Sequence, residues 1–235
     1  MTDALPDKII ELSKVTRVYR QGRVDVPALR GLDLSVSTGE FLALSGPSGS
    51  GKTTTLNLIG ALDKPTSGSV RLEGQVLASL GARALSRVRR DRIGFVFQSY
   101  NLVPVLTAYE NAELVLALQG VPPAARRDRV MDLLKAVGLE GLERRRPDEL
   151  SGGQQQRVAI ARAIAADPAV VLADEPTANV DSDTAEMLLS LMGTLNRERG
   201  VTFVFSTHDP RVMAHARRVV RIVDGQVASD EVVAR

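Results

Sequence analysis

Residues 46–53 read Gly46-Pro47-Ser48-Gly49-Ser50-Gly51-Lys52-Thr53, a full match to the pattern G-x-x-x-x-G-K-[ST]. An apolar run of strand length, residues 41–44, precedes this stretch, and a helix-like segment, residues 53–62, follows it. This strand–loop–helix order is the context in which the pattern forms a phosphate-binding loop. The stretch therefore indicates an α/β protein built around a nucleotide-binding loop.

The residue types of this loop suit a triphosphate. Glycines let backbone N–H groups point inward, and the start of the following helix favours anionic oxygens. We predict that Lys52 reaches the β- and γ-phosphates and that the Thr53 hydroxyl ligates Mg²⁺. The alternative is a Gly/Ser-rich turn that only caps a helix, but the four fixed positions arise by chance on the order of once in a hundred such chains. The predicted nucleotide-binding residues here are Gly46, Pro47, Ser48, Gly49, Ser50, Gly51, Lys52, Thr53 and Thr54.

Apolar runs of strand length recur along the chain, with few charges and little alternation. They lie at residues 41–44, 93–97, 170–173, 201–205 and 219–223. This pattern is typical of strands that are buried on both faces of a sheet. Helix-like segments separate several of the runs, at residues 53–62, 158–166 and 184–198. The order predicts an α/β layered fold with a mostly parallel sheet.

Two other parts of the chain have different patterns. Four glycine-punctuated segments alternate more and predict a small antiparallel sheet beside the main one, at residues 9–18, 24–29, 32–36 and 70–77. Residues 102–167 have a helical pattern with Pro and Gly breaks, which predicts a helical insert rather than a separate domain. We expect one domain over residues 1–235, with its core near residues 1–98 and 168–235 and an α-helical subdomain near residues 99–167.

Composition excludes several classes of protein. The 235 residues are 44% hydrophobic, which rules out wholesale disorder. Lys and Arg number 30 against 28 Asp and Glu, so the net charge of +2 gives no case for a nucleic-acid partner. The absence of Cys excludes disulfides and thiolate zinc sites, and two His are too few for a His-built metal centre.

The chain shows no signal for membrane insertion. Residues 1–8 contain acids and a proline but no apolar stretch, so we expect no secretory signal there. The longest apolar runs are about five residues, whereas a membrane-spanning helix needs roughly 20. We expect a soluble chain that meets a membrane through a partner. Arginine clusters at residues 87–92, 126–129 and 144–146 are interpreted as solvated helix faces without a function.

Two carboxylates follow the apolar run at residues 170–173. Asp174 is placed to hold Mg²⁺ directly or through a water. Glu175 is placed to accept a proton from an attacking water, a role typically worth about 10² to 10⁴ in rate. Taken alone, the pair is equally consistent with a strand-to-turn transition. Beside a phosphate-binding loop, we favour the catalytic interpretation.

A glycine pair marks the start of another predicted helix, in Leu150-Ser151-Gly152-Gly153-Gln154. Ser151 has the character of an N-cap, and the residues after it have helical spacing. The glycines leave the helix start bare, so that a phosphate can approach Ser151. By spacing alone, however, a capped helix after a Pro-containing loop is the better interpretation.

This segment resembles the signature of ATP-binding cassette (ABC) ATPases, and the other motifs occur in that family's order over essentially the whole chain. The resemblance implies a P-loop NTPase (RecA-like) core, ATP hydrolysis, and ATP and Mg²⁺ as cofactors. It also implies a head-to-tail homodimer, in which Ser151 and Gly153 of one subunit close over the γ-phosphate held by Lys52 of the other. Gly152 and Gln154 belong to the same signature.

The resemblance assigns roles to four further residues. Tyr19 matches the aromatic that stacks on adenine, and Gln98 matches the glutamine that senses Mg²⁺ and links the core to the helical insert. Asp181 matches the aspartate of a loop that crosses between subunits. His208 matches the histidine that contacts the γ-phosphate and orients Glu175. Taken singly, Tyr19 could pack on the core, and a lone His after a strand is more often a structural hydrogen bonder.

A finer resemblance concerns residues 61–68, 97–104, 176–181 and 207–210. They are similar to the MacB-, LolD- and FtsE-like branch, which serves lipoprotein release, macrolide-type export and cell-division signalling. The resemblance implies an ATPase on the cytoplasmic face of the inner membrane that drives an integral membrane permease, for export or for lipoprotein, peptide or drug extrusion. The alternative is a nucleotide-switched scaffold or signalling ATPase in a cell-division-type membrane complex.

Overall fold

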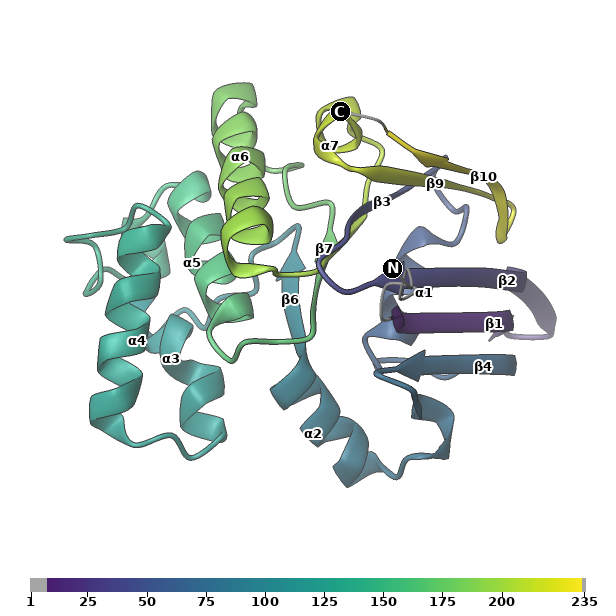
Figure 1. Cartoon of the computed structure of the whole chain (residues 1–235), viewed down its shortest axis with the longest axis horizontal. Coiled ribbons are helices and arrows are strands. Elements are labelled where there is room, and N and C mark those ends of the chain that lie inside the picture. The colour runs from purple at the N-terminus through teal and green to yellow at the C-terminus, as the bar shows by residue number, and fades with distance from the viewer. Residues whose placement is uncertain (1–7, 234–235) are drawn as a thin grey trace, which may run out of the picture.

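The computed structural model describes residues 8–233, so the expectation about a secretory signal lies, apart from Lys8, outside the described residues. The described chain forms two sheets and a group of helices (Figure 1). The helices α3, α4 and α5 lie at one end of the molecule, and the strands β1, β2 and β4 lie at the other.

The larger sheet has six strands in the order β10-β9-β3-β8-β7-β6. Its strands are β3 (Phe41–Ser45), β6 (Ile93–Phe97), β7 (Val170–Asp174), β8 (Phe203–Ser206), β9 (Arg218–Val223) and β10 (Gln226–Val232). All neighbours are parallel except β9 and β10. The predicted mostly parallel sheet is confirmed. Strand β10 was not predicted because its sequence, QVASDEV, contains no apolar run.

The parallel strands send alternate side chains into two separate cores. In β3, Phe41 and Ala43 join a core with the helices α3 to α6, whereas Leu42 and Leu44 join a core with α1 and the second sheet. Strand β8 alternates in the same way, since Phe203 and Val204 lie in different cores. Burial on both faces explains why these strands are apolar at every position before their final serine.

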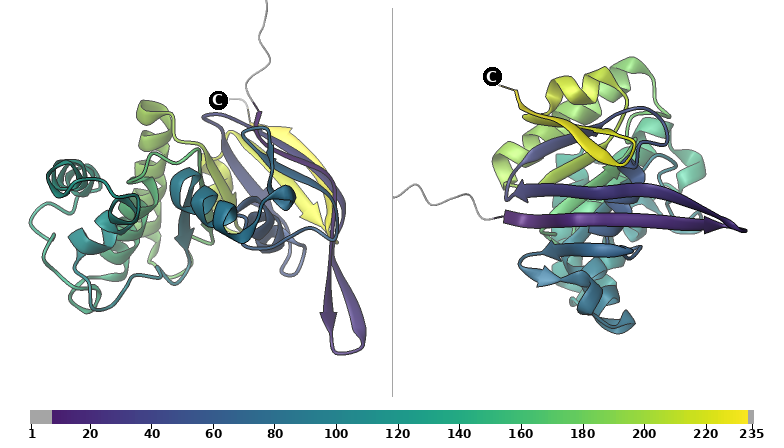
Figure 2. Two further views of the ribbon diagram at one scale, coloured as in Figure 1. Left: turned by 90° about the horizontal axis from the view of Figure 1, so that it is seen from below. Right: turned by 90° about the vertical axis from the view of Figure 1, so that its right-hand side faces the viewer.

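The second sheet is antiparallel, in the order β2-β1-β4-β5. Its strands are β1 (Lys8–Gln21), β2 (Val24–Ser37), β4 (Ser67–Leu72) and β5 (Gln75–Val76). The β1–β2 hairpin extends beyond the rest of the molecule (Figure 2). Two predicted boundaries here are wrong. Residues 24–29 and 32–36 form one strand, because Gly31 (φ 84°) makes an irregularity in the β1–β2 ladder and does not end it. Residues 70–77 are interrupted by a turn at Glu73 and Gly74, both with positive φ.

Two of the predicted helical segments, 53–62 and 184–198, correspond to helices at residues 52–59 and 182–199. The helices are α1 (Lys52–Ile59), α2 (Ala82–Arg92), α3 (Ala108–Leu118), α4 (Pro123–Ala136), α5 (Gly152–Ile164), α6 (Ser182–Arg199) and α7 (Pro210–His215), with 3-10 turns at Leu77–Ser79 and Pro147–Glu149. Helix α3 starts with a capping box between Thr107 and Glu110. Helix α5 starts at Gly152 with Ser151 as its N-cap, as predicted, and its first six residues precede the segment with apolar helical spacing at 158–166 because they are glycines, glutamines and an arginine.

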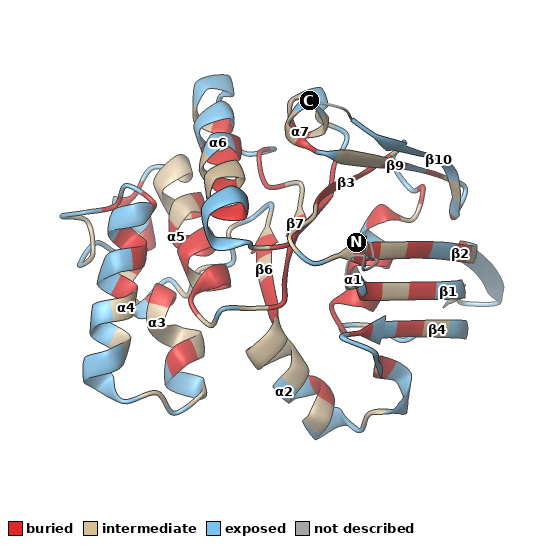
Figure 3. Cartoon of the chain, viewed as in Figure 1, coloured by how far each residue is buried: buried red, intermediate tan, exposed pale blue. Residues whose placement is uncertain are grey.

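The longest described helix, α6, buries one side through Ala185, Leu188 and Met192, and its other side is exposed (Figure 3). This spacing of three and four residues is that of a helix packed on a core by one face. Among residues 8–233, no helix is both long enough and apolar enough to cross a membrane.

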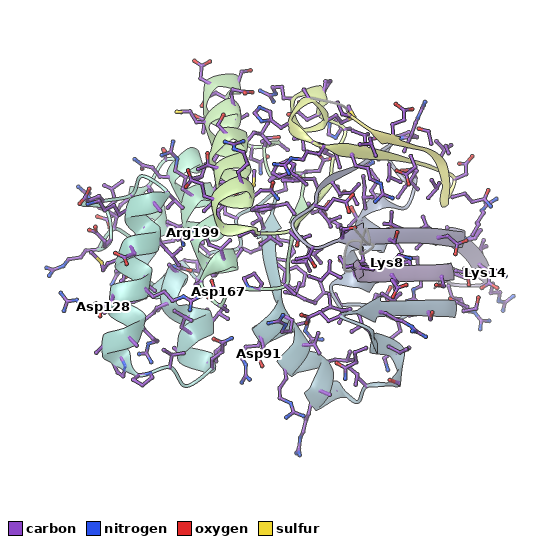
Figure 4. All side chains as sticks on the ribbon, viewed as in Figure 1. Lys8, Lys14, Asp91, Asp128, Asp167 and Arg199 are labelled. Atoms are coloured by element: carbon purple, nitrogen blue, oxygen red, sulfur yellow. The ribbon has the colours of Figure 1, made fainter. Side chains whose placement is uncertain are left out.

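The arginine clusters form ion pairs with nearby carboxylates. Arg90 of α2 pairs with Asp91 at 2.7 Å, and Arg126 of α4 pairs with Glu113 of α3 at 2.9 Å. Arg129 pairs with Asp167 (Figure 4 labels Asp91 and Asp167). The Arg90 and Arg129 pairs accord with the interpretation of the clusters as solvated faces, since partly exposed ion pairs of this kind add little stability, whereas the side chains of Arg126 and Glu113 are only 20% and 19% exposed.

Candidate functional site

The loop after β3 closes around the amino group of Lys52. Lys52 Nζ donates hydrogen bonds to the carbonyl oxygens of Gly46 (2.8 Å) and Pro47 (3.0 Å), and its side chain is buried. Gly46 has a φ of 143°, and a Cβ atom there would lie 2.1 Å from the carbonyl oxygen of Ile222. Only glycine fits this position. The loop thus holds an ammonium group beside the N-terminus of α1, an arrangement that suits a chain of phosphates.

Asp174, at the end of β7, faces the start of α1. Thr53 Oγ1 donates to Asp174 Oδ1 at 3.2 Å and lies 3.3 Å from Oδ2. The sheet brings these groups together, because β3 and β7 both flank β8 in parallel and end at the same edge. A hydroxyl and a carboxylate at the mouth of the loop are the oxygen ligands that Mg²⁺ prefers.

Glu175 is held by the segment that follows β8. His208 Nδ1 lies 2.7 Å from Glu175 Oε1, and Thr207 Oγ1 donates to Glu175 Oε2 at 3.3 Å. The backbone N–H of Glu175 donates to the carbonyl of Ser206 at 2.9 Å. Glu175 also has a φ of 45°, an uncommon conformation for a residue with a side chain, and such strain is often found at functional sites. The carboxylate is oriented by its neighbours and available as a proton acceptor.

Gln98 follows β6 and is tied to a residue that sequence reasoning missed. Asn179 Nδ2 donates to the carbonyl of Gln98 at 2.9 Å, and Gln98 Nε2 lies 3.4 Å from Asn179 Oδ1. Tyr100 Oη donates to the carbonyl of Asn179 at 3.1 Å. The signal for these contacts was weak, because 81 residues separate Gln98 from Asn179.

Many of these residues line one cavity of about 740 Å³, although Gly46 and Asp174 are not among its lining residues. The cavity is lined by the predicted residues Tyr19, Pro47, Ser48, Gly49, Ser50, Gly51, Lys52, Thr53, Thr54, Gln98, Glu175 and His208 and by the unpredicted Ala28 and Ser206. The hydroxyl oxygens of Ser50 and Ser206 are buried without a hydrogen-bond partner within the described chain. Unpaired buried hydroxyls beside a buried ammonium fit a site that takes an anionic, oxygen-rich ligand.

The signature residues lie outside this cavity. Ser151 is exposed and caps α5 by accepting from the Gln154 backbone N–H, while Gln154 Oε1 accepts from the Ser151 N–H. A Cβ at Gly153 would lie 2.4 Å from Thr184 Cγ2, so any larger residue there would require the Thr184 side chain to shift.

Asp181 lies close to the same glycine, because it caps α6 by accepting from Thr184 N and Oγ1. These two hydrogen bonds hold the pKa of Asp181 below its ordinary value. The structure thus brings Asp181 and the signature glycine together, but apart from the phosphate-binding loop of the same chain.

The residues at the cavity fit a magnesium ion that is completed by phosphates. Among residues 8–233, no group of three or more His, Asp or Glu side chains is arranged to hold a metal alone. Mg²⁺ usually takes one or two protein oxygens together with phosphates and waters. Thr53 and Asp174 supply such oxygens beside the loop.

Comparison with known proteins identifies the family. The sequence matches the family described as ABC transporter over residues 29–178. The chain belongs to the ABC transporter family. It is 49% identical to an uncharacterized ABC transporter ATP-binding protein of Thermotoga maritima, over 95% of each chain. It is 47% identical to the lipoprotein-releasing system ATP-binding protein LolD of Anaeromyxobacter dehalogenans, over 98% of this chain and 97% of the relative.

A solved structure has the same fold. It is the dimeric structure of a post-hydrolysis state of the ATP-binding cassette MJ0796 bound to ADP and Pi, with a TM-score of 0.88 and 44% identity over 96% of this chain and 99% of the other. The predicted ABC ATPase fold is confirmed, and the chain is an ATP-binding and ATP-hydrolysing subunit of an ABC transporter. The chain spans only 31% of a macrolide export ATP-binding/permease protein MacB from Syntrophobacter fumaroxidans, at 48% identity.

Proposed function

We propose that this ABC ATPase hydrolyses ATP as a head-to-tail homodimer. In each site, Lys52 holds the β- and γ-phosphates, and Ser151 and Gly153 of the second copy close over the γ-phosphate. The observation that carries this proposal is the separation of exposed Ser151 from the cavity that contains Lys52. A second chain is therefore needed to bring the two motifs to one nucleotide. The dimeric state of MJ0796 supports the formation of a dimer.

Within each site, we assign the following roles. Tyr19 stacks on adenine, the backbone of residues 46–54 binds the phosphates, and Thr53, Asp174 and Gln98 hold Mg²⁺, which neutralises phosphate charge. Glu175 accepts a proton from the attacking water, and His208 orients Glu175 and contacts the γ-phosphate. The 2.7 Å contact between His208 and Glu175 supports the last assignment. Asp181 lies in the loop that crosses to the second subunit.

Closure of this dimer drives an integral membrane permease, to which the ATPase binds peripherally on the cytoplasmic face. A groove of about 430 Å³ between β6, α2, α3 and α5 supports such a contact, since it combines Phe97, Leu114 and exposed Leu118 with Arg162. A short cytoplasmic helix of the permease fits there. The groove lies where the helical subdomain, residues 99–167, meets the core, residues 1–98 and 168–235. By analogy with the names LolD and MacB, the transporter exports or extracts its substrate.

Co-purification in detergent tests this assignment. The tagged full-length chain is expected to recover a membrane subunit with few transmembrane helices and a periplasmic domain. Recovery of division proteins without such a subunit, or of nucleic acid, would instead support a nucleotide-switched scaffold or a different class of ATPase.

The Leu118→Glu variant is expected to recover several-fold less of the membrane subunit with unchanged ATP binding, because a charge in an apolar groove is costly to bury. Val232→Glu is the matched control, since Val232 is also exposed but lies on β10. The amount of co-purified permease and the Kd for ATP are measured together. Equal recovery with both variants would place the docking surface elsewhere.

The Ser151→Arg variant is expected to block ATP-dependent dimerisation while each monomer still binds ATP. An arginine side chain at position 151 is too large for the space between the two subunits, where Ser151 would lie against the γ-phosphate bound by the second copy. Ser151→Ala is the control, because it removes the cap, at about 1 kcal/mol, without adding bulk. Size-exclusion chromatography with ATP measures the dimer. A persistent dimer of Ser151→Arg would reject the role of Ser151 across the interface.

A further inference from the structure

Tyr19, the aromatic side chain at the edge of the cavity, is held through its hydroxyl. Tyr19 Oη donates to Asp63 Oδ2 at 2.8 Å. Asp63 also receives two hydrogen bonds from Arg17, from Nε to Oδ2 and from Nη2 to Oδ1, each 2.8 Å long. A bidentate guanidinium–carboxylate pair is among the strongest and most directional polar contacts in proteins. The tyrosine hydroxyl is therefore bound to a carboxylate that is itself fixed.

Arg17 also covers one face of the same ring. Its guanidinium carbon lies 4.5 Å from the centroid of the Tyr19 ring, within the range of a cation–π contact. Arg17 and Tyr19 are two residues apart on β1 and so project from the same face of the strand. Tyr19 lines the cavity, whereas Arg17 does not. One face of the ring is thus occupied by the guanidinium, and the ring meets the cavity with the rest of its surface.

Asp63 is anchored to the helix that begins at the phosphate-binding loop. The backbone N–H groups of Leu62 and Asp63 both donate to the carbonyl of Asn57 in α1, at 2.9 and 3.2 Å. Asp63 Oδ1 also accepts from the Lys64 N–H at 2.7 Å. The carboxylate consequently has a defined position relative to α1, and through α1 relative to Lys52.

We infer that Asp63 and Arg17 are positioning residues that hold the Tyr19 ring ready to stack on the purine of the nucleotide. This inference rests on the proposed stacking role of Tyr19. A ring that is already fixed loses no rotational freedom when the base binds, so its contribution to affinity is larger. The cluster ties the base-binding strand β1 to the phosphate-binding helix α1. Asp63 therefore sets the position of the base contact relative to the phosphate contact.

The inference predicts a loss of affinity that depends on the base. Tyr19→Phe removes the hydroxyl and keeps the ring, whereas Asp63→Ala frees both Tyr19 and Arg17. Each is expected to raise the Kd and KM for ATP about two- to tenfold, the range for immobilising one side chain, with kcat nearly unchanged. Magnesium tripolyphosphate, which has no base, is expected to bind all variants equally.

Additional variants separate this role from a structural one. Asp63→Asn retains an acceptor for the tyrosine hydroxyl. Its Kd for ATP is expected to lie between that of Asp63→Ala and that of the unchanged chain. The double variant Tyr19→Phe/Asp63→Ala is expected to bind ATP no worse than Asp63→Ala alone, because both changes remove the same hydrogen bond between Tyr19 and Asp63. Asp33→Ala is the matched control: Asp33 accepts from the Lys14 N–H at 2.8 Å on the same sheet, outside the cavity. It is expected to leave ATP binding unchanged.

Three outcomes would overturn these assignments in different ways. If Tyr19→Ala does not weaken ATP binding, the proposed stacking itself fails. If Tyr19→Ala weakens ATP binding but Tyr19→Phe and Asp63→Ala do not, stacking stands and the positioning role is wrong. If Asp63→Ala weakens the binding of tripolyphosphate as much as the binding of ATP, Asp63 acts through α1 and not through Tyr19. Equilibrium titrations of the full chain, with thermal unfolding of each variant, distinguish the three.

Discussion

The Glu175→Gln variant is expected to bind ATP as the unchanged chain does and to lose nearly all turnover, about 10²- to 10⁴-fold in kcat. Glutamine has the shape of glutamate, so the contacts of residue 175 with His208 and Thr207 can be retained. Its amide oxygen, however, cannot take the proton of an attacking water. Because Lys52 and Thr53 are unchanged, the phosphates are still bound.

The closed dimer of this variant should consequently persist. Chromatography with ATP is expected to show a stable dimer, while phosphate release in a single turnover is nearly absent. Glu186→Gln is a matched control, because Glu186 Oε1 of α6 lies 2.6 Å from His215 Nε2 of α7 in a similar pair outside the cavity. This control should hydrolyse ATP at the ordinary rate. Normal hydrolysis by Glu175→Gln would remove Glu175 from the role of general base.

The Lys52→Ala variant is expected to lose tight ATP binding. Lys52 is the one lysine or arginine among the described residues that line the cavity. A hydrogen bond to a charged group contributes about 1.5 to 3 kcal/mol, so losing one raises the Kd roughly 10- to 150-fold. The loss of the bonds from Nζ to the Gly46 and Pro47 carbonyls also leaves the loop less well held.

Calorimetric titration with ATP and Mg²⁺ measures this change. Lys135→Ala is the control, because Lys135 is exposed, pairs with Glu140 on the surface at 3.6 Å, and lies outside the cavity. It should bind ATP like the unchanged chain. Unchanged nucleotide affinity in Lys52→Ala would contradict the assignment of residues 46–53 as the phosphate-binding loop.

Local sequence was sufficient where a feature depends on neighbours in the chain. The loop at residues 46–53 was predicted because glycine conformation and the start of α1 are local properties. Strand β6 was predicted with its observed bounds, since burial on both faces leaves an uninterrupted apolar run. Where one face is exposed, as in β10, no such run exists and the strand was missed.

Contacts between distant segments could not be predicted in the same way. The contacts of Asn179 with Gln98 and Tyr100 are known only from the structure. They form because the fold places the segment of Gln98 beside the loop that leads to Asp181. Asp63 lies within residues 61–68, a segment that resembles the family, but its hydrogen bond to Tyr19 spans 44 residues. Neither the hydrophobic period nor residue spacing carries information about such pairs.

By itself, the sequence determined the position of the loop at residues 46–53, the α/β class and the identity of the two carboxylates at the end of β7, because each follows from local conformation and from burial of short segments. Only the tertiary structure decided that Tyr19, Glu175 and His208 share one cavity with Lys52 and that Ser151 does not. The physical reason is that parallel strands distant in sequence end at one edge of the sheet, while α5 begins elsewhere. Distances across that edge are set by packing of the two cores, not by the order of residues.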